Sequence, residues 1–311
     1  MIKFVTLIYS FMILNKFDPW NSKLCTCPFK LSLNPYTGCS HNCVYCYASS
    51  YIKNFFNPRP KRNLIEKLKR EAKKLNGQII SISNSSDPYQ HLEEKLKLTR
   101  KCLEILKNYN CKIQIITKSN LVLRDIDILK EMNAMVSITI TTINNEIAKK
   151  LEPNAPKPNE RINAVKELIE NKIPVSVRID PIIPFLNDEQ EDLIKELAKI
   201  GVKHITSSTY KVREDNWKRF EQAFPEIAEK LKELYFEKGE KISNYYYLPK
   251  DLRLKIMLKM KKLTNKYNIS FACCREGFKI NDNTCDGSWL LNSFNFFQSK
   301  NVKNLFQYIN T

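Results

Sequence analysis

The stretch Gly38-Cys39-Ser40-His41-Asn42-Cys43-Val44-Tyr45-Cys46-Tyr47 decides how this chain is interpreted. Its cysteines follow the spacing C-x3-C-x2-C, with an aromatic residue directly before the third. Four-iron clusters normally take four cysteine ligands, so a set of three leaves one iron open. An open metal position is where a small molecule binds and reacts. The spacing therefore predicts a reactive iron–sulfur centre, and a structural zinc site with His41 as fourth ligand is the alternative.

Strand and helix patterns alternate through the middle of the chain. Short β-branched runs predict strands at 31–33, 78–83, 112–117, 135–142, 175–179 and 202–206. Apolar spacing near 3.6 residues predicts helices at 61–76, 92–108, 125–132, 160–171 and 188–200. Six strands with intervening helices indicate a parallel sheet of right-handed βαβ units. Such sheets carry their sites at the carboxyl ends of the strands.

The alternation ends near residue 212, which divides the chain into three parts. We expect a lead segment at 1–29, an α/β domain with a parallel sheet at 30–212 and a mostly helical extension at 213–311. In the extension, 214–241 and 252–267 are expected to be mostly helical, with breaks at Pro225 and Pro249. The apolar stretch 4–14 is too short to span a bilayer and is expected to form a leading strand.

Composition and charge narrow the classes of partner. The 311 residues carry 51 Lys and Arg against 33 Asp and Glu, a net charge of +18. Such a charge favours a polyanion such as nucleic acid, although a solvated lysine-rich surface explains it equally well. Ten cysteines without a secretory leader indicate metal binding in the cytoplasm, with no membrane partner.

Several segments together resemble a known family. They are the phrase from Asn34 to Ala48, Ser86-Asp87-Pro88-Tyr89-Gln90, Thr117-Lys118-Ser119, Arg124-Asp125, Glu152-Pro153 and Pro181-Ile182-Ile183-Pro184. This order resembles the radical S-adenosylmethionine (SAM) superfamily, in its spore photoproduct lyase-like branch, also called DNA repair photolyase-like.

The resemblance implies a fold and two cofactors. The fold is a partial (β/α)6 radical SAM barrel with a mostly helical, cysteine-containing C-terminal extension. Cys39, Cys43 and Cys46 would ligate a four-iron, four-sulfur ([4Fe–4S]) cluster, and SAM would occupy the open iron. An electron from a flavodoxin- or ferredoxin-like reductant would cleave SAM to a 5′-deoxyadenosyl radical, while the protein positions the cofactor.

The resemblance also implies SAM-binding residues. Tyr45 would shield the cluster near the adenine, and Ser85 and Asp87 stand where relatives bind the SAM amino group. The family's usual Gly-Gly-Glu is absent there. Asp87 could equally be the N-cap of the helix after Pro88.

Three further residues complete the implied set. Lys118 would pair with the SAM carboxylate, its alternative being a surface lysine at a strand end. Thr139 would reach the ribose, unless it reflects only the β-propensity of threonine. Arg178 sits in an apolar strand and needs a partner, which would be the SAM carboxylate, Asp180 or a glutamate.

One departure from the branch concerns the hydrogen-donating cysteine of spore photoproduct lyase. The matching segment from Ile82 to Gln90 contains no cysteine. We therefore do not expect this chain to repair thymine dimers.

The C-terminal extension holds a second group of cysteines. Cys273, Cys274 and Cys285 resemble the auxiliary iron–sulfur clusters of several radical SAM subfamilies, with at most one of the adjacent pair as a ligand. Cys25 and Cys27 could complete the site. The alternative is buried free thiols packing as small hydrophobic groups, which is also how Cys102 and Cys111 are interpreted.

Three functions fit these features. The first is a radical SAM enzyme that acts on nucleic acid, and the second is a radical SAM enzyme that modifies a protein or a small metabolite. The third is a non-enzymatic, metal-bearing nucleic-acid-binding protein, which the strand–helix alternation disfavours.

Overall fold

The computed structural model describes residues 12–17, 22–82 and 84–292. Most of the leading strand expected at 4–14 lies outside these ranges. No helix among the described residues has the length and apolar character needed to cross a membrane.

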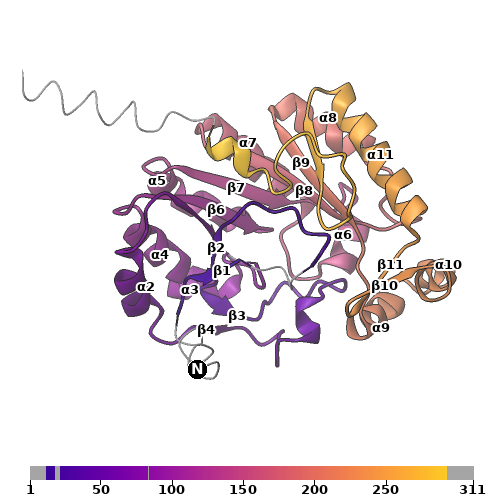
Figure 1. Ribbon diagram of the computed structural model, residues 1–311, viewed down its shortest axis with the longest axis horizontal. Helices are drawn as coiled ribbons and strands as arrows, with labels where there is room; N and C mark the ends of the chain where they lie inside the picture. The colour runs from indigo at the N-terminus through magenta and orange to yellow at the C-terminus, as the bar shows by residue number, and fades with distance from the viewer. Residues whose placement is uncertain (1–11, 18–21, 83, 293–311) are drawn as a thin grey trace, which may run out of the picture.

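A single curved sheet of eight strands organises the molecule (Figure 1). Its order is β1-β2-β5-β6-β7-β8-β9-β12. The strands are β1 (Asn15–Lys16), β2 (Leu31–Leu33), β5 (Gln78–Ile82), β6 (Cys111–Thr117), β7 (Ala134–Thr139), β8 (Val175–Ile182), β9 (His204–Thr209) and β12 (Ser270–Cys273). All neighbours are parallel except β1, which pairs antiparallel with β2. The six expected strands are present and adjacent in chain order, which confirms the predicted α/β barrel fold.

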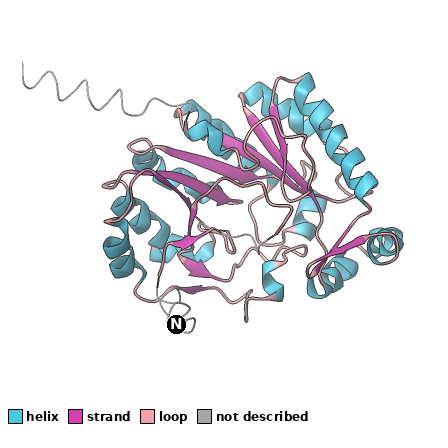
Figure 2. Ribbon diagram, in the orientation of Figure 1, coloured by secondary structure: helices cyan, strands magenta, loops and turns pink. Residues whose placement is uncertain are grey.

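The helices pack along the outside of this sheet, from α2 and α4 near one edge to α8 and α11 near the other (Figures 1 and 2). The barrel helices are α2 (Leu64–Ala72), α3 (His91–Leu96), α4 (Leu98–Leu106), α5 (Ile126–Leu129), α6 (Asn145–Leu151), α7 (Pro158–Glu170) and α8 (Glu191–Ile200). Every residue of β7 and β9 is buried. Side chains alternate between the two faces of a strand, so both faces of these strands are covered, as in other parallel sheets.

Helix ends explain where some strands begin. Helix α8 ends at Gly201, whose φ of 96° is the left-handed conformation that glycine adopts at helix C-termini. β9 therefore begins at His204, two residues later than expected.

Helix α7 starts with Pro158 in its first turn, and the Glu160 carboxylate accepts a hydrogen bond from the Lys157 amide at 2.6 Å.

The C-terminal extension contains more strand than its sequence indicated. It comprises α9 (Glu214–Ala223), α10 (Pro225–Phe236), the hairpin β10 (Glu240–Ile242) and β11 (Tyr245–Tyr247), α11 (Lys250–Lys266) and β12. Strand β12 pairs in parallel with β9 and extends the barrel sheet. A four-residue strand carries little sequence signal, and its pairing partner is about 65 residues away, so tertiary contact decides its conformation.

Candidate functional site

The cysteine loop comes after β2 and lies between two short strands that pair with each other, β3 (Tyr36–Thr37) and β4 (Arg59–Pro60). Its entry requires glycine, because Gly38 has a φ of 82° and an added Cβ would lie 2.3 Å from the Phe55 carbonyl oxygen. Gln90 holds the loop from both sides: its Nε2 donates to the Gly38 carbonyl at 3.0 Å, and its Oε1 accepts from the Ser40 amide at 2.9 Å. The loop is thus tied to the segment after β5.

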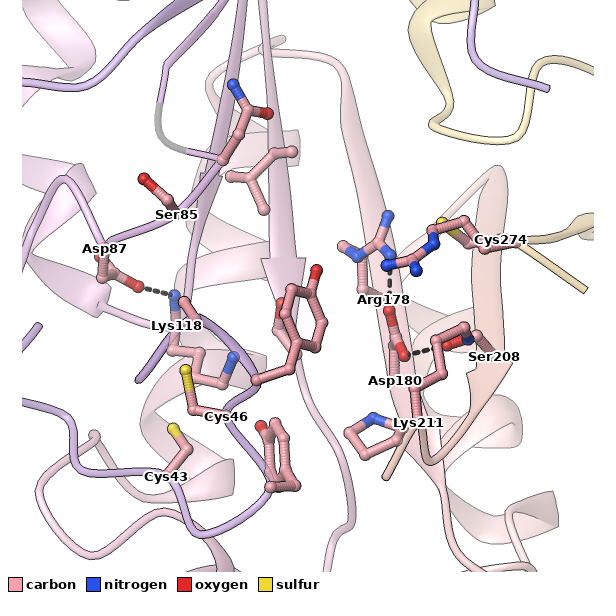
Figure 3. Close-up of a pocket in the computed structure, with 18 of the residues that line it drawn as sticks. Cys43, Cys46, Ser85, Asp87, Lys118, Arg178, Asp180, Ser208, Lys211 and Cys274 are labelled. Carbon is pink, nitrogen blue, oxygen red and sulfur yellow. Dashed lines mark hydrogen bonds and ion pairs between the residues drawn. The ribbon is translucent and has the colours of Figure 1, made fainter. Parts of the chain in front are cut away.

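The three cysteines face one cavity of about 260 Å³. Cys43 and Cys46 point into it from one wall in Figure 3. Burial raises the pKa of the Cys39 thiol to about 12, and the Asp87 carboxylate adds to this shift. Burial also raises the pKa of Cys43 and Cys46. These thiols become thiolates when a metal supplies compensating positive charge, so metal binding here releases protons.

Asp87 organises the carboxyl ends of β5 and β6. Its Oδ1 accepts from Thr117 Oγ1 at 2.6 Å and from the Tyr89 amide at 2.9 Å, and its Oδ2 accepts from the Lys118 amide at 2.8 Å (Figure 3). Helix α3 begins at His91 with Gln90 as its N-cap, so the interpretation of Asp87 as an N-cap is wrong. Asp87 instead fixes the backbone of Lys118 and lines the cavity.

Lys118 lies at the end of β6 and reaches into the cavity. Its ammonium is 5.6 Å from the centre of the Tyr45 ring, within cation–π range. Burial lowers the pKa of this ammonium, but Cys43 and Glu152 raise it more strongly, and the net change is upward. Lys118 is therefore a stable positive charge beside the cysteines, available to an anionic group, and the surface-lysine alternative is wrong.

A buried ion pair supports Tyr45 from behind. The Tyr45 hydroxyl donates to the Glu152 carboxylate, and Arg161 Nη1 lies 2.5 Å from Glu152 Oε2. Burial raises the pKa of Glu152, but the positive charges of Arg161 and Lys118 lower it by more. The net pKa is below the ordinary value, so the carboxylate stays ionised. Glu152-Pro153 was one segment of the resemblance, but the sequence assigned no role to Glu152 and did not indicate Arg161 on α7. An arginine among the apolar positions of α7 was the signal that could have identified it.

Two other segments of the resemblance, Ser86–Gln90 and Arg124-Asp125, are in contact with each other. The Tyr89 hydroxyl donates to Asp125 at 3.0 Å, and Arg124 donates to Glu93 at 2.6 Å. These pairs join the segment after β5 to the segment after β6.

Ser85 and Thr139 both line the cavity. The Ser85 hydroxyl donates to Asn34 Oδ1 at 3.4 Å, and the Asn84 amide donates to the same oxygen at 3.0 Å. Thr139 ends β7, and its carbonyl accepts from Arg161 Nη1 at 3.1 Å. All six expected SAM-binding residues thus surround one cavity, although their roles toward SAM stay predictions.

The opposite wall comes from β8, β9 and the extension (Figure 3). Arg178 Nη2 lies 2.5 Å from Asp180 Oδ2, so the partner that the sequence left open is Asp180. Ser208 Oγ donates to the second oxygen of Asp180 at 2.5 Å. Lys211, which also lines the cavity, pairs with the buried Glu276 carboxylate at 3.1 Å. The sequence did not indicate Ser208, Lys211 or Glu276 as site residues: Ser208 and Lys211 stand in and just after a short strand without a motif, and only the fold brings Glu276 of the extension to this wall.

The C-terminal cysteines point in different directions. Cys274 lines the cavity, and an Arg178 hydrogen bond to Cys274 adds to the interactions that raise the pKa of the guanidinium. Cys273, its neighbour on β12, packs in the core, where its Sγ contacts Asn281 Oδ1 at 3.3 Å. Cys285 is buried, and its Sγ lies 3.3 Å from Cys27 Sγ. Cys102 and Cys111 are core residues, as expected.

His41, the ligand in the zinc alternative, is 2% exposed. Its Nε2 lies 3.7 Å from Asp87 Oδ2. Burial lowers the pKa of His41 to about 4 in spite of the neighbouring carboxylate, so the ring is neutral at pH 7.

The donor set of the cysteine loop suits an iron–sulfur cluster. Three soft thiol groups line one cavity, next to the half-buried cation Lys118 and an aromatic ring. Thiolates are the ligands that iron–sulfur clusters use. The residues present therefore fit a cluster with one iron left to a small ligand.

Comparison with known proteins supports this interpretation. Residues 33–197 match the family model of the radical SAM superfamily, which is 165 of 311 residues. An uncharacterised Methanocaldococcus jannaschii protein is 38% identical over 51% of this chain and 62% of its own length. An uncharacterised protein of Acidianus two-tailed virus is 31% identical over 70% of this chain and 80% of its own. A radical SAM Nα-GlyT isomerase of Pseudomonas phage M6 is 21% identical over 82% of this chain and 56% of its own length.

Solved structures agree on the fold. Spore photoproduct lyase in complex with dinucleoside spore photoproduct superposes with a TM-score of 0.61, at 15% identity, over 80% of this chain and 74% of that one. Because the family model spans more than half of its length, the chain belongs to the radical SAM superfamily.

Proposed function

We propose that the protein is an enzyme that binds a [4Fe–4S] cluster through Cys39, Cys43 and Cys46 and uses SAM to act on a nucleic-acid substrate. The observation that carries the proposal is the cavity that these cysteines share with Lys118, Tyr45 and the opposite wall. When bound, the cluster and SAM supply a 5′-deoxyadenosyl radical on receipt of one electron from a reductant.

The chain's own groups would bind and orient the cofactor. Lys118 would pair with the SAM carboxylate, and Asp87 and Ser85 would accept from its amino group. Tyr45, held by Glu152, would pack beside the cluster and limit water access to it. Arg178 is already paired with Asp180, so its role would be to hold that wall in place.

The cavity's composition supports a nucleic-acid substrate. Its charged side chains are Lys30, Lys118, Arg178, Lys211 and Arg275 against Asp87, Asp180 and Asp286, and its aromatic side chains are Phe17, Tyr45, Tyr47, Phe55 and Tyr210. Cations attract phosphate and aromatic faces stack on bases. The net charge of +18 and the dinucleoside bound by spore photoproduct lyase point the same way.

The deciding experiment is anaerobic turnover. The protein is reconstituted with iron and sulfide, reduced with dithionite and given SAM, and 5′-deoxyadenosine is measured with DNA, RNA, peptides or no addition. We expect product formation that is stimulated by one nucleic acid. A well-loaded protein that forms no product with any addition contradicts the enzyme proposal, and stimulation by peptides alone contradicts the nucleic-acid substrate.

Nucleic-acid affinity is predicted to depend steeply on salt. Fluorescence anisotropy with a labelled oligonucleotide should show binding at 50 mM salt that weakens at least ~10-fold at 200 mM, because binding releases condensed counterions. The cofactor-free chain serves as a comparison, since its surface charge is unchanged. Absence of binding at 50 mM salt would contradict a nucleic-acid substrate and favour a protein or a small metabolite instead.

The Lys118→Met variant is predicted to bind SAM about 10-fold more weakly, since losing one charge-assisted hydrogen bond costs about 1.4 kcal/mol. Calorimetric titration of the reconstituted protein measures this affinity. Lys112→Met is the matched control, because Lys112 lies near the other end of β6 and bonds Asn292 outside the cavity. Equal SAM affinity in the two variants would contradict the role of Lys118.

A further inference from the structure

Four cysteines from opposite ends of the chain meet at one side of the cavity. Cys25, Cys27 and Cys274 line it, and Cys285 lies behind Cys27. Cys25 and Cys27 precede β2, whereas Cys274 follows β12 and Cys285 lies in the loop after it. The Cys39, Cys43 and Cys46 loop also borders the cavity, but it accounts for none of these four residues.

Two sulfur atoms of this group are close, and the other two cysteines lie near them. Cys27 Sγ lies 3.3 Å from Cys285 Sγ, and the Cys27 amide donates to Cys25 Sγ at 3.5 Å. The side chains of Cys25 and Cys27 are also in hydrogen-bond contact, and Cys274 is within electrostatic range of Cys27. All four are free thiols, and the Cys27–Cys285 separation exceeds the roughly 2.05 Å of a disulfide bond.

The separation points to one shared ion. Two thiolates on a tetrahedral zinc ion, with zinc–sulfur bonds of about 2.3 Å, lie roughly 3.8 Å apart. In a four-iron cluster each thiolate binds a different iron, which places the ligand sulfurs farther from one another. The observed 3.3 Å between Cys27 and Cys285 is nearer to the spacing on one ion, and a separation of the two sulfurs by about 0.5 Å would admit a common metal ion.

Positive groups surround the four cysteines. The buried Lys30 ammonium is within electrostatic range of Cys27 and Cys285 and is anchored to Asp286 and to Gln114. Arg178 is in hydrogen-bond contact with Cys274. Four thiolates on a divalent ion carry a net charge of −2, and these cations offset part of it.

We propose that Cys25, Cys27, Cys274 and Cys285 bind a single tetrahedral metal ion of the zinc class. The site is all-thiolate and closed, so its role is structural. It fastens the segment before β2 to the segment after β12 and completes one wall of the cavity. Among the described residues, no three Cys, His, Asp or Glu side chains are placed closely enough to hold a metal ion in this structure. The side chains of Cys39, Cys43 and Cys46 are likewise not yet gathered around one position. Both sites would close as metal binds.

This assignment differs from the set expected from the sequence. Cys273 is excluded because it faces the core and contacts Asn281. The Cys274 amide continues the pairing with β9 by donating to the Ser207 carbonyl at 2.8 Å, so the side chains of Cys273 and Cys274 point to opposite faces and Cys274 is the one that lines the cavity. The proposal also replaces the expected auxiliary iron–sulfur cluster by a redox-inert ion, and it does not rest on the proposed function.

The test uses a chain in which the first site is removed. In the Cys39→Ala/Cys43→Ala/Cys46→Ala variant, purified from zinc-supplemented cells, elemental analysis should find about one zinc per chain. Adding Cys27→Ser and Cys285→Ser should abolish it. Adding Cys273→Ser instead is the matched control, and it should leave the zinc in place. Loss of zinc in both would overturn the assignment.

A second measurement needs no substitution at the proposed site. X-ray absorption at the zinc edge, on the triple alanine variant, should show four sulfur neighbours at about 2.3 Å. Nitrogen or oxygen neighbours, no bound zinc, or a Cys27–Cys285 disulfide found by mass spectrometry would each overturn the proposal. So would iron and sulfide that persist in the triple variant and vanish with Cys285→Ser.

Discussion

The Cys43→Ala variant is expected to lose the iron–sulfur cluster and with it all reductive cleavage of SAM. Partners that contact a metal ligand only from outside typically contribute 10–100-fold, so loss of a ligand itself should lower 5′-deoxyadenosine formation by more than about 100-fold. Cys43 is buried and lines the same cavity as Lys118. Iron content, the visible absorption of the cluster and product formation measure the effect.

Cys102→Ala is the matched control for this variant. Cys102 is also a fully buried thiol, but it packs in α4 against the core and does not line the cavity. It should retain iron and product formation at a modest cost in thermal stability. A Cys43→Ala protein that still cleaves SAM at the normal rate would refute the assignment of the cysteine loop as the cluster site.

The Arg161→Met variant is expected to lose about 3–5 kcal/mol of stability at pH 7, because it leaves the Glu152 carboxylate charged and buried without its partner. Arg161 and Glu152 are each 1% exposed. Denaturant unfolding of the cofactor-free chain measures the loss. The exposed pair Lys107–Glu131 provides the control, and Lys107→Met should cost less than about 1 kcal/mol.

The pH dependence gives this prediction a second check. Arg161 and Lys118 overcome the effect of burial and hold the pKa of Glu152 below its ordinary value. A depressed folded-state pKa stabilises the protein above the unfolded-state pKa, and this contribution is lost as pH falls through the folded-state value. In Arg161→Met the carboxyl takes up a proton more readily, so the gap to wild type should narrow toward low pH. A gap that stays constant between pH 7 and pH 4 would contradict an electrostatic cause.

Local patterns predicted the barrel well. The six parallel strands appear near their expected places because β-branched runs bounded by turns are read from short windows. The boundaries at β8 and β9 moved by two or three residues, since pairing with neighbours and the Gly201 cap set them. Strand β12 escaped prediction because its four residues acquire their conformation from β9.

The site, like the fold, has parts that the local sequence predicted and parts that depend on tertiary contacts. The spacing of Cys39, Cys43 and Cys46 within eight residues, together with the ordered segments that follow it, predicted the family, because these motifs are local in sequence. Only tertiary structure decided that Glu152 and Arg161 stand behind Tyr45 and that Cys27 meets Cys285. These contacts join residues up to 258 positions apart. Their proximity depends on how the whole sheet curves and closes, which no short stretch of sequence encodes.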